Sequence, residues 1–150
     1  MPASSILHVS MKIIAIAGAR SGVGKTTLAG RIRTVLPNAV HVKVGSHHPK
    51  VAKSTPLYPA KTPVDKIKQE HADAAYLILE SNSILNTFDP ECVIFLDADN
   101  PKPSAGPARE RADIIRGHAL TSEMIASLSR KLQLPRQTIQ KIISMANATS

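Results

Sequence analysis

The segment from residue 11 to residue 36 constrains the fold of this chain more than any other. It begins with an apolar stretch, KIIAIA at 12–17, whose β-branched residues are typical of a buried strand. The sequence GARSGVGKTT follows at 18–27, and apolar residues then recur at helical spacing over 28–36. Strand, glycine-containing loop and helix in this order are the context that a phosphate-binding loop requires.

The glycines and the polar side chains of this loop have the chemistry that phosphate binding needs. Gly22 and Gly24 let the backbone approach an anion and turn its N–H groups inward. A helix that begins near Lys25 directs its first amides and the positive end of its dipole at the same anion. We expect the Lys25 ammonium to reach the β- and γ-phosphates and the Thr26 hydroxyl to ligate Mg²⁺. The residues expected to contact the nucleotide are Ser21, Gly22, Val23, Gly24, Lys25, Thr26 and Thr27.

The loop departs from the strict pattern at one position. Ala19 stands where that pattern has glycine, directly after Gly18. We expect the departure to be mild, because the Gly-Lys-Thr end of the loop makes most of the phosphate contacts. The alternative interpretation is a glycine-rich turn with an exposed lysine.

The chain beyond this segment alternates strand and helix signals. Strands are predicted at 40–44, 74–80 and 92–97, and residues 107–116 are ambiguous between a short helix and a strand at 112–115. Helices are predicted from Thr62 and within 81–88, whereas the long segment 45–61 and the proline-rich segment 100–107 are predicted as loops. This alternation predicts an α/β fold with a mostly parallel sheet covered by helices on both faces.

Two of the predicted strands end in a carboxylate. Glu80 ends one and Asp97 ends the other, and ligands of parallel sheets lie at the carboxyl ends of the strands. A phosphate loop needs such an acid to organise Mg²⁺ and its waters. We favour Glu80, because a strand placed beside the first strand lies closest to the loop. Asp97 is the second candidate for this role. Alternatively, Asp97 and Asp99 contact the base or the ribose of the nucleotide.

Composition limits the classes of protein to which this chain can belong. It has 150 residues and a net charge of +8, and Lys and Arg dominate residues 20–68, where Asp65 is the one acid, so an anionic ligand is expected. Cys92, the single cysteine, opens an apolar strand and is predicted to be a buried core thiol. No apolar run is long enough to span a membrane, and residues 1–10, predicted as a flexible leader, lack the features of a signal peptide. We therefore expect a cytoplasmic protein.

The last thirty residues differ from the rest in pattern. We divide the chain into a nucleotide-binding domain at 11–117 and a C-terminal helical hairpin at 118–150. Two short helices joined by a turn at 133–135 are predicted there, with basic side chains facing outward. This arrangement resembles a helix-turn-helix, and the alternative is a hairpin that packs on the sheet or on a second copy of the chain.

The loop from Gly18 to Leu28 resembles that of the P-loop NTPases that include MinD, ParA and dethiobiotin synthetase. In that group a signature lysine lies five positions before the invariant lysine, and Arg20 occupies this position here. The signature residue of that group reaches across a two-fold interface toward the phosphates of a facing subunit. The resemblance therefore implies a homodimer in which Arg20 joins Lys25 and Glu80 as a catalytic residue. The alternative is that Arg20 is a surface charge or contacts the α-phosphate of its own nucleotide.

Within this group the chain is most similar to the molybdopterin-guanine dinucleotide biosynthesis protein B family. The similar pieces are SGVGKTTL at 21–28, VKVGSHH at 42–48 and LILE at 77–80. The resemblance implies a GTP-binding protein that assists a partner enzyme in making the dinucleotide form of the molybdenum cofactor. The sequence does not indicate whether the nucleotide is GTP or ATP.

Several alternatives remain open on the sequence. A small-molecule kinase uses the same loop, with the basic segment 45–61 closing over a second substrate. A nucleotide-regulated DNA-binding protein would use residues 121–147, and its DNA affinity would fall steeply with salt. His47 and His48 invite a metal site, but no cysteine or nearby acid completes a ligand set, so we expect them to line the substrate side or to be exposed.

Overall fold

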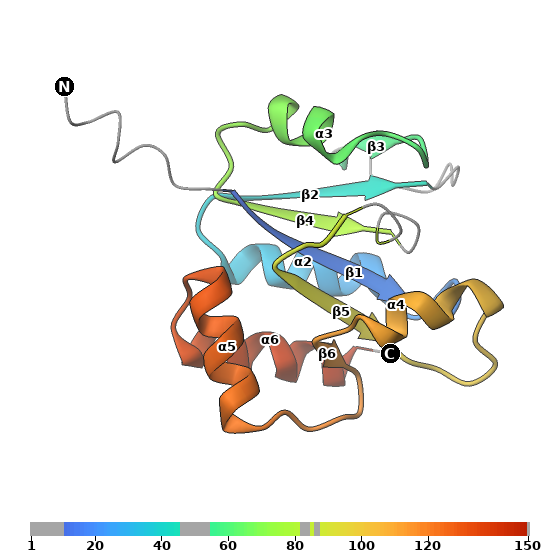
Figure 1. Ribbon diagram of the computed structural model, residues 1–150, viewed down its shortest axis with the longest axis vertical. Coiled ribbons are helices and arrows are strands. Elements are labelled where there is room, and N and C mark those ends of the chain that lie inside the picture. Colours follow the sequence, from blue (N-terminus) through green and yellow to red (C-terminus); the bar gives the residue numbers. More distant parts are fainter. Residues whose placement is uncertain (1–10, 46–54, 82–84, 86–87, 150) are drawn as a thin grey trace.

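Six parallel strands form the central sheet of the protein (Figure 1). The structure, a computed structural model, describes residues 11–45, 55–81, 85 and 88–149. The strands lie in the order β3-β2-β4-β1-β5-β6, and every neighbouring pair is parallel. Their bounds are Lys12–Gly18 (β1), Ala39–Val44 (β2), Leu57–Tyr58 (β3), Tyr76–Glu80 (β4), Cys92–Leu96 (β5) and Ile114–Ile115 (β6). The expected α/β fold with a parallel sheet is confirmed.

Helices connect the strands and cover both faces of the sheet (Figure 1). A short 3₁₀ helix, η2, spans Pro103–Ala105. The α-helices are Lys25–Val35 (α2), Val64–Glu70 (α3), Gly106–Glu110 (α4), Ser122–Leu132 (α5) and Arg136–Ala148 (α6). None of the helices in the described part of the chain is long and apolar enough to cross a membrane.

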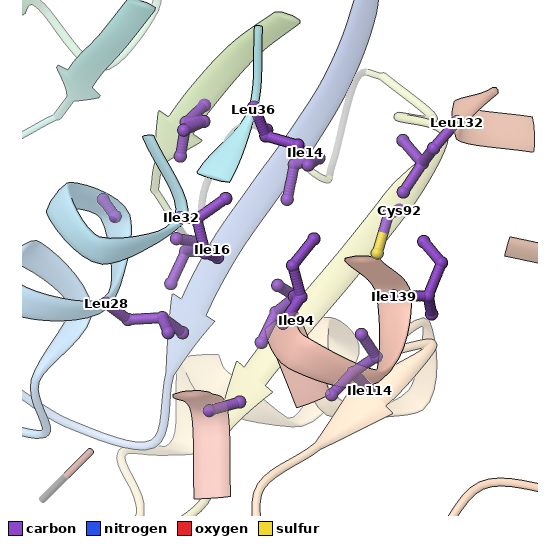
Figure 2. Close-up of a cluster of buried hydrophobic side chains, with 14 of the residues drawn as sticks. Ile14, Ile16, Leu28, Ile32, Leu36, Cys92, Ile94, Ile114, Leu132 and Ile139 are labelled. Atoms are coloured by element: carbon purple, nitrogen blue, oxygen red, sulfur yellow. The ribbon is translucent and has the colours of Figure 1, made fainter. Parts of the chain in front are cut away.

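β1 explains why both faces are covered, because its side chains alternate between two hydrophobic clusters. Ile14 and Ile16 belong to the cluster under α2, α5 and α6, and Figure 2 shows Ile16 beside Ile32 of α2 and Ile14 beside Leu36. Ile13 and Ala15 point to the opposite face, where α3 and α4 pack. A strand buried on both sides must be apolar at every position, which is what the KIIAIA run provides.

The C-terminal helices belong to the first of these clusters. Leu132 of α5 and Ile139 of α6 lie around Cys92 in Figure 2, and α6 also packs against α2. The Tyr76 hydroxyl of β4 donates a hydrogen bond of 2.7 Å to the Leu132 carbonyl oxygen. Cys92 is buried as predicted, and burial raises the pKa of its thiol.

Three local predictions are corrected or refined. The segment predicted as the loop 45–61 contains β3, which pairs with the end of β2 through Lys43↔Leu57 and Val44↔Tyr58. The segment predicted as the loop 100–107 contains η2 and the start of α4, because Pro103 and Pro107 occupy first-turn helix positions where a proline is tolerated. The ambiguous segment 107–116 contains both a helix, α4, and a strand, β6.

Two further predictions lie on residues outside the described part of the chain. The short helix expected within 81–88 falls mostly on 82–84 and 86–87. The leader at 1–10 also lies outside it.

Candidate functional site

The loop between β1 and α2 has the backbone conformation that its glycines permit. Gly22 and Gly24 have positive φ angles of 78° and 104°, in the left-handed region that favours glycine. Gly24 is the N-cap of α2, and its carbonyl oxygen accepts the Leu28 amide at 2.9 Å. Because glycine has no side chain to cap the helix, the amides of the first turn are left for a group beyond the N-terminus.

Gly18 and Ala19 show how the loop folds back over the end of β1. A Cβ atom at Gly18 would lie 2.5 Å from Cγ2 of Val23 and 3.3 Å from Cδ of Lys25, so only glycine fits there. Ala19 is fully buried in the second cluster, and its amide donates to the Leu96 carbonyl oxygen at 3.0 Å. An alanine is therefore accommodated at the position where the strict pattern has glycine.

The strand that ends in Glu80 lies beside β1, as expected. β4 pairs with β1 so that Glu80 is the partner of Ile16, two residues before the end of β1. Glu80 is 2% exposed, and its two carboxylate oxygens accept from the Thr26 hydroxyl at 3.1 Å and 2.9 Å. The structure thus brings together two of the three side chains that the sequence singled out as candidate Mg²⁺ ligands, and Asp97 is the third.

Two further polar side chains meet the same carboxylate, and the sequence analysis did not identify them. His41 Nε2 lies 2.8 Å from Glu80 Oε1, and Lys43 Nζ lies 3.5 Å from Oε2. Both come from β2, the other neighbour of β4, where Lys43 is in register with Glu80. The signal was the alternation of β2, because its polar positions 41 and 43 share one face while 40, 42 and 44 are valines.

These contacts keep Glu80 ionised. Burial raises the pKa of its carboxyl group, but the hydrogen bonds from His41 and Thr26 and the charge of Lys43 outweigh that effect. The pKa of Glu80 therefore lies below its ordinary value of 4.5. Glu80 is consequently a carboxylate, able only to accept hydrogen bonds or to ligate a cation, at neutral pH.

Lys25 lies in a positively charged and partly desolvated environment. Burial lowers the pKa of its ammonium group, as do the charges of Lys43 and Lys102, whereas Glu80 raises it. The net result is a pKa below the ordinary value of 10.5. Lys102 Nζ is also 3.5 Å from the Ser21 hydroxyl oxygen. Several cations around one loop favour an anionic ligand at this place.

The other acid expected at a strand end has different neighbours. Asp97 Oδ1 accepts the Ala98 amide at 3.0 Å, and Oδ2 is 3.6 Å from Arg109 Nη2. Among the described residues, no hydrogen bond joins Asp97 to Thr26 or to Glu80. Asp97 follows β5, on the opposite side of β1 from Glu80.

Arg20 is exposed on the outer side of the loop. Its Nε donates a hydrogen bond of 3.1 Å to the Asp99 carbonyl oxygen of its own chain. This contact joins the loop to the segment after β5. Among the described residues, no other hydrogen bond or ion pair involves its guanidinium group, and the side chain is exposed.

The chemistry of the Thr26–Glu80 pair suits Mg²⁺. This cation prefers oxygen ligands and is commonly held by one or two carboxylates, waters and substrate phosphates. A hydroxyl and a carboxylate beside the first turn of α2 provide such oxygens. Among the described residues, no three or more His, Cys, Asp or Glu side chains form a group that could hold a metal ion by themselves. His47 and His48 lie outside the described residues.

The basic residues of the C-terminal helices are exposed. They are Arg130, Lys131, Arg136 and Lys141. The apolar faces of the same helices are turned toward α2 and the sheet.

No protein-family model matches the sequence, and no curated protein matches it. The likeness of this loop to known phosphate loops therefore rests on its own residues and their geometry.

Proposed function

We propose that the protein binds a nucleoside triphosphate together with Mg²⁺ at residues 18–27 and hydrolyses it slowly. The observation that carries the proposal is the hydrogen-bonded pair of Thr26 and Glu80 at the N-terminus of α2. A glycine-rich turn with an exposed lysine would need no buried carboxylate beside the following threonine. Here an ionised carboxylate and a partly buried lysine flank the same helix start.

Each residue then has a definite task. The amides of the first turn of α2 and the Lys25 ammonium bind the phosphates, with Ser21 and Thr27 at the edges of the loop. Thr26 and Glu80 hold Mg²⁺, which when bound neutralises charge that develops on the phosphate oxygens. His41 and Lys43 hold Glu80 ionised and fix its orientation. We also assign to Glu80 the task of orienting a water toward the terminal phosphate, because it is an ionised carboxylate in contact with Thr26.

The biological setting is proposed from the resemblance alone. It is that of an accessory protein of molybdopterin-guanine dinucleotide synthesis, acting as a homodimer beside a partner enzyme. GTP and ATP are both candidates for the nucleotide. Transfer of phosphate to an acceptor other than water would identify a small-molecule kinase instead.

Calorimetric titration with GTP and with ATP, with and without Mg²⁺, tests the proposal. We expect binding of at least one of them, stronger when Mg²⁺ is present. Thr26→Ala should remove most of the Mg²⁺ dependence while keeping part of the binding, because the hydroxyl is a metal ligand rather than the main phosphate contact.

Thr34→Ala is the matched control. Thr34 is exposed on the same helix, and its hydroxyl donates to the Arg31 carbonyl oxygen within the helix. This variant should bind the nucleotide as the wild type does. Failure of the wild-type chain to bind either triphosphate would refute the proposed function.

A further inference from the structure

Arg116 is the most extensively hydrogen-bonded side chain near the phosphate loop. It lies directly after β6, is half-buried, and donates to backbone carbonyl oxygens of three separate segments. Nη1 donates to Val23 in the loop at 2.8 Å and to Thr149 after α6 at 2.6 Å. Nη2 and Nε donate to Asp97, after β5, at 2.6 Å and 3.2 Å. One guanidinium thus joins the loop, the end of β5 and the end of α6.

Val23 is the residue of the loop that this guanidinium holds. Its side chain is 3% exposed in the first hydrophobic cluster and packs against Gly18, where a Cβ would be only 2.5 Å away. Its carbonyl oxygen is held by Arg116. Gly22 and Gly24, on either side of Val23, both have positive φ angles. Glycine has the widest backbone freedom of any residue type, so these two residues do not fix the loop by themselves.

Fixing this carbonyl also fixes an amide of the loop. The C=O and N–H groups of a trans peptide point in opposite directions, and the described chain contains no cis peptide. The direction of the Val23 carbonyl therefore sets the direction of the Gly24 N–H at the N-terminus of α2. We propose that Arg116 is a positioning residue for the phosphate loop, holding the Val23–Gly24 peptide in the orientation used to bind phosphate. This inference rests on the proposed function.

The same contact connects the loop to the end of α6. Thr149 is buried, and both its amide and its hydroxyl bond to the Met145 carbonyl oxygen. The Asn147 side-chain oxygen accepts the Gly117 amide at 2.8 Å, next to Arg116. The last turn of α6 and the residue after it are therefore both bonded to Arg116 or Gly117, directly after β6. Nucleotide binding that orders residues 21–27 should in turn protect the amides of 147–149 from hydrogen exchange.

Substitution of Arg116 tests the proposal, with the triphosphate that the wild type binds more tightly as the probe and Mg²⁺ present. We expect Arg116→Gln to weaken binding about tenfold or more, because the loop loses its fixed orientation in the free protein. Arg116→Lys should weaken it less, about three- to fivefold, because one ammonium keeps the charge but cannot reach Val23 and Asp97 with the geometry of the fork.

Arg111→Gln is the matched control for a merely structural effect. Arg111 is also half-buried, donates to the Phe88 carbonyl oxygen at 3.0 Å and pairs with Asp89, away from the loop. Its loss should lower stability without changing nucleotide affinity beyond about twofold. Equal loss of affinity in the Arg111 and Arg116 variants, or binding by Arg116→Gln within about twofold of the wild type, would overturn the proposal.

Two measurements keep the test decisive if Arg116→Gln does not fold. The lysine variant then decides, and its binding within about twofold of the wild type overturns the proposal. Hydrogen exchange on the unaltered chain adds a second criterion: nucleotide that protects 21–27 but leaves 147–149 unchanged also overturns it. A wild-type chain that binds no triphosphate contradicts the proposed function itself, so the two failures are distinguishable.

Discussion

At the scale of single residues, the candidate site is centred on the buried carboxylate of Glu80 and the three polar side chains that contact it. The carboxylate accepts hydrogen bonds from Thr26 in the loop and from His41 of β2, and it forms an ion pair with Lys43 of β2. A carboxylate only accepts hydrogen bonds, so the proton of the His41 contact belongs to Nε2 of the imidazole. The desolvation cost of burying Glu80 is thus offset by three donors, at a position where a lone carboxylate would be strongly unfavourable.

The first prediction concerns the pH dependence of stability. The pKa of Glu80 is lower in the folded chain than the ordinary value of 4.5, so its ionised form favours folding. This contribution is fully present above pH 4.5 and is lost as the pH falls through the folded pKa. The free energy of unfolding of the wild type should therefore decrease from neutral to acidic pH. In Glu80→Gln we expect a smaller decrease, with the free energy measured by chemical denaturation at each pH. The exposed Glu110→Gln should keep the wild-type slope, and equal slopes in all three proteins would contradict the prediction.

The second prediction separates binding from stability at Lys25. Because the pKa of Lys25 is lowered in the folded chain, chiefly by burial, the charged form of its ammonium group disfavours folding. Lys25→Met should therefore raise the melting temperature of the nucleotide-free protein. The same variant should lose one to two decades of triphosphate affinity, because the charge-assisted phosphate contact is gone.

Thermal unfolding and calorimetry on the same samples measure both effects. Lys131→Met, on the exposed surface of α5, should change neither by a comparable amount. A Lys25 variant that loses stability and affinity together would show that the lysine supports the fold instead.

At the scale of the elements, α6 is part of the protein's core. Ile139, Ile142 and Ala146 are each at most 1% exposed and pack in the cluster that also holds Leu28 and Ile32 of α2. α2 is the helix whose N-terminus is expected to meet the phosphates. Packing of α6 against α2 therefore supports the element on which the site is built.

The third prediction measures this support. Ile142→Ala removes a buried side chain from between α6 and its neighbours and should lower the unfolding free energy by about 2–5 kcal/mol. Urea denaturation followed by circular dichroism measures the loss. Gln140→Ala, on the exposed side of the same helix, should change it by no more than about 0.5 kcal/mol. A loss of the same small size at Ile142 would mean that α6 is not held by this packing.

At the scale of the whole molecule, the exposed Arg20 is the residue that would face a second copy of the chain in the homodimer implied by the resemblance. Arg20 keeps one bond to Asp99 of its own chain and is accessible. An arginine suits a contact to phosphate across an interface, since it stays charged and donates two parallel hydrogen bonds. This is the arrangement implied by the resemblance of the loop.

The fourth prediction follows from that arrangement. If Arg20 acts on the nucleotide of a facing subunit, turnover per subunit should rise with protein concentration. Arg20→Ala should lower turnover far more than nucleotide affinity. Mixing Arg20→Ala with Lys25→Ala should restore part of the activity, because one kind of mixed site keeps both residues. Turnover independent of concentration, with no rescue on mixing, would show that Arg20 acts only within its own chain.

The sequence by itself determined the features that depend on neighbouring residues. The strand–loop–helix order of 12–36 follows from apolar periodicity and glycine placement, and the uninterrupted apolar run of β1 predicts burial on both faces. The glycines at 22 and 24 adopt the positive φ that such a loop needs. Lys25 and Thr26 could be proposed as ligands because the role expected of each is tied to its position in the loop.

Tertiary structure alone decided which distant side chains meet at the loop. Glu80 could be proposed from its place at a strand end, but its contact with Thr26 depends on β4 lying directly beside β1. His41 reaches Glu80 across 39 residues of sequence, and Arg116 reaches Val23 across 93. Such contacts are fixed by strand order and helix packing. The alternation of β2 shows that positions 41 and 43 share a face, but it does not show that Glu80 lies opposite them, because residues far apart become neighbours only when the whole sheet has formed.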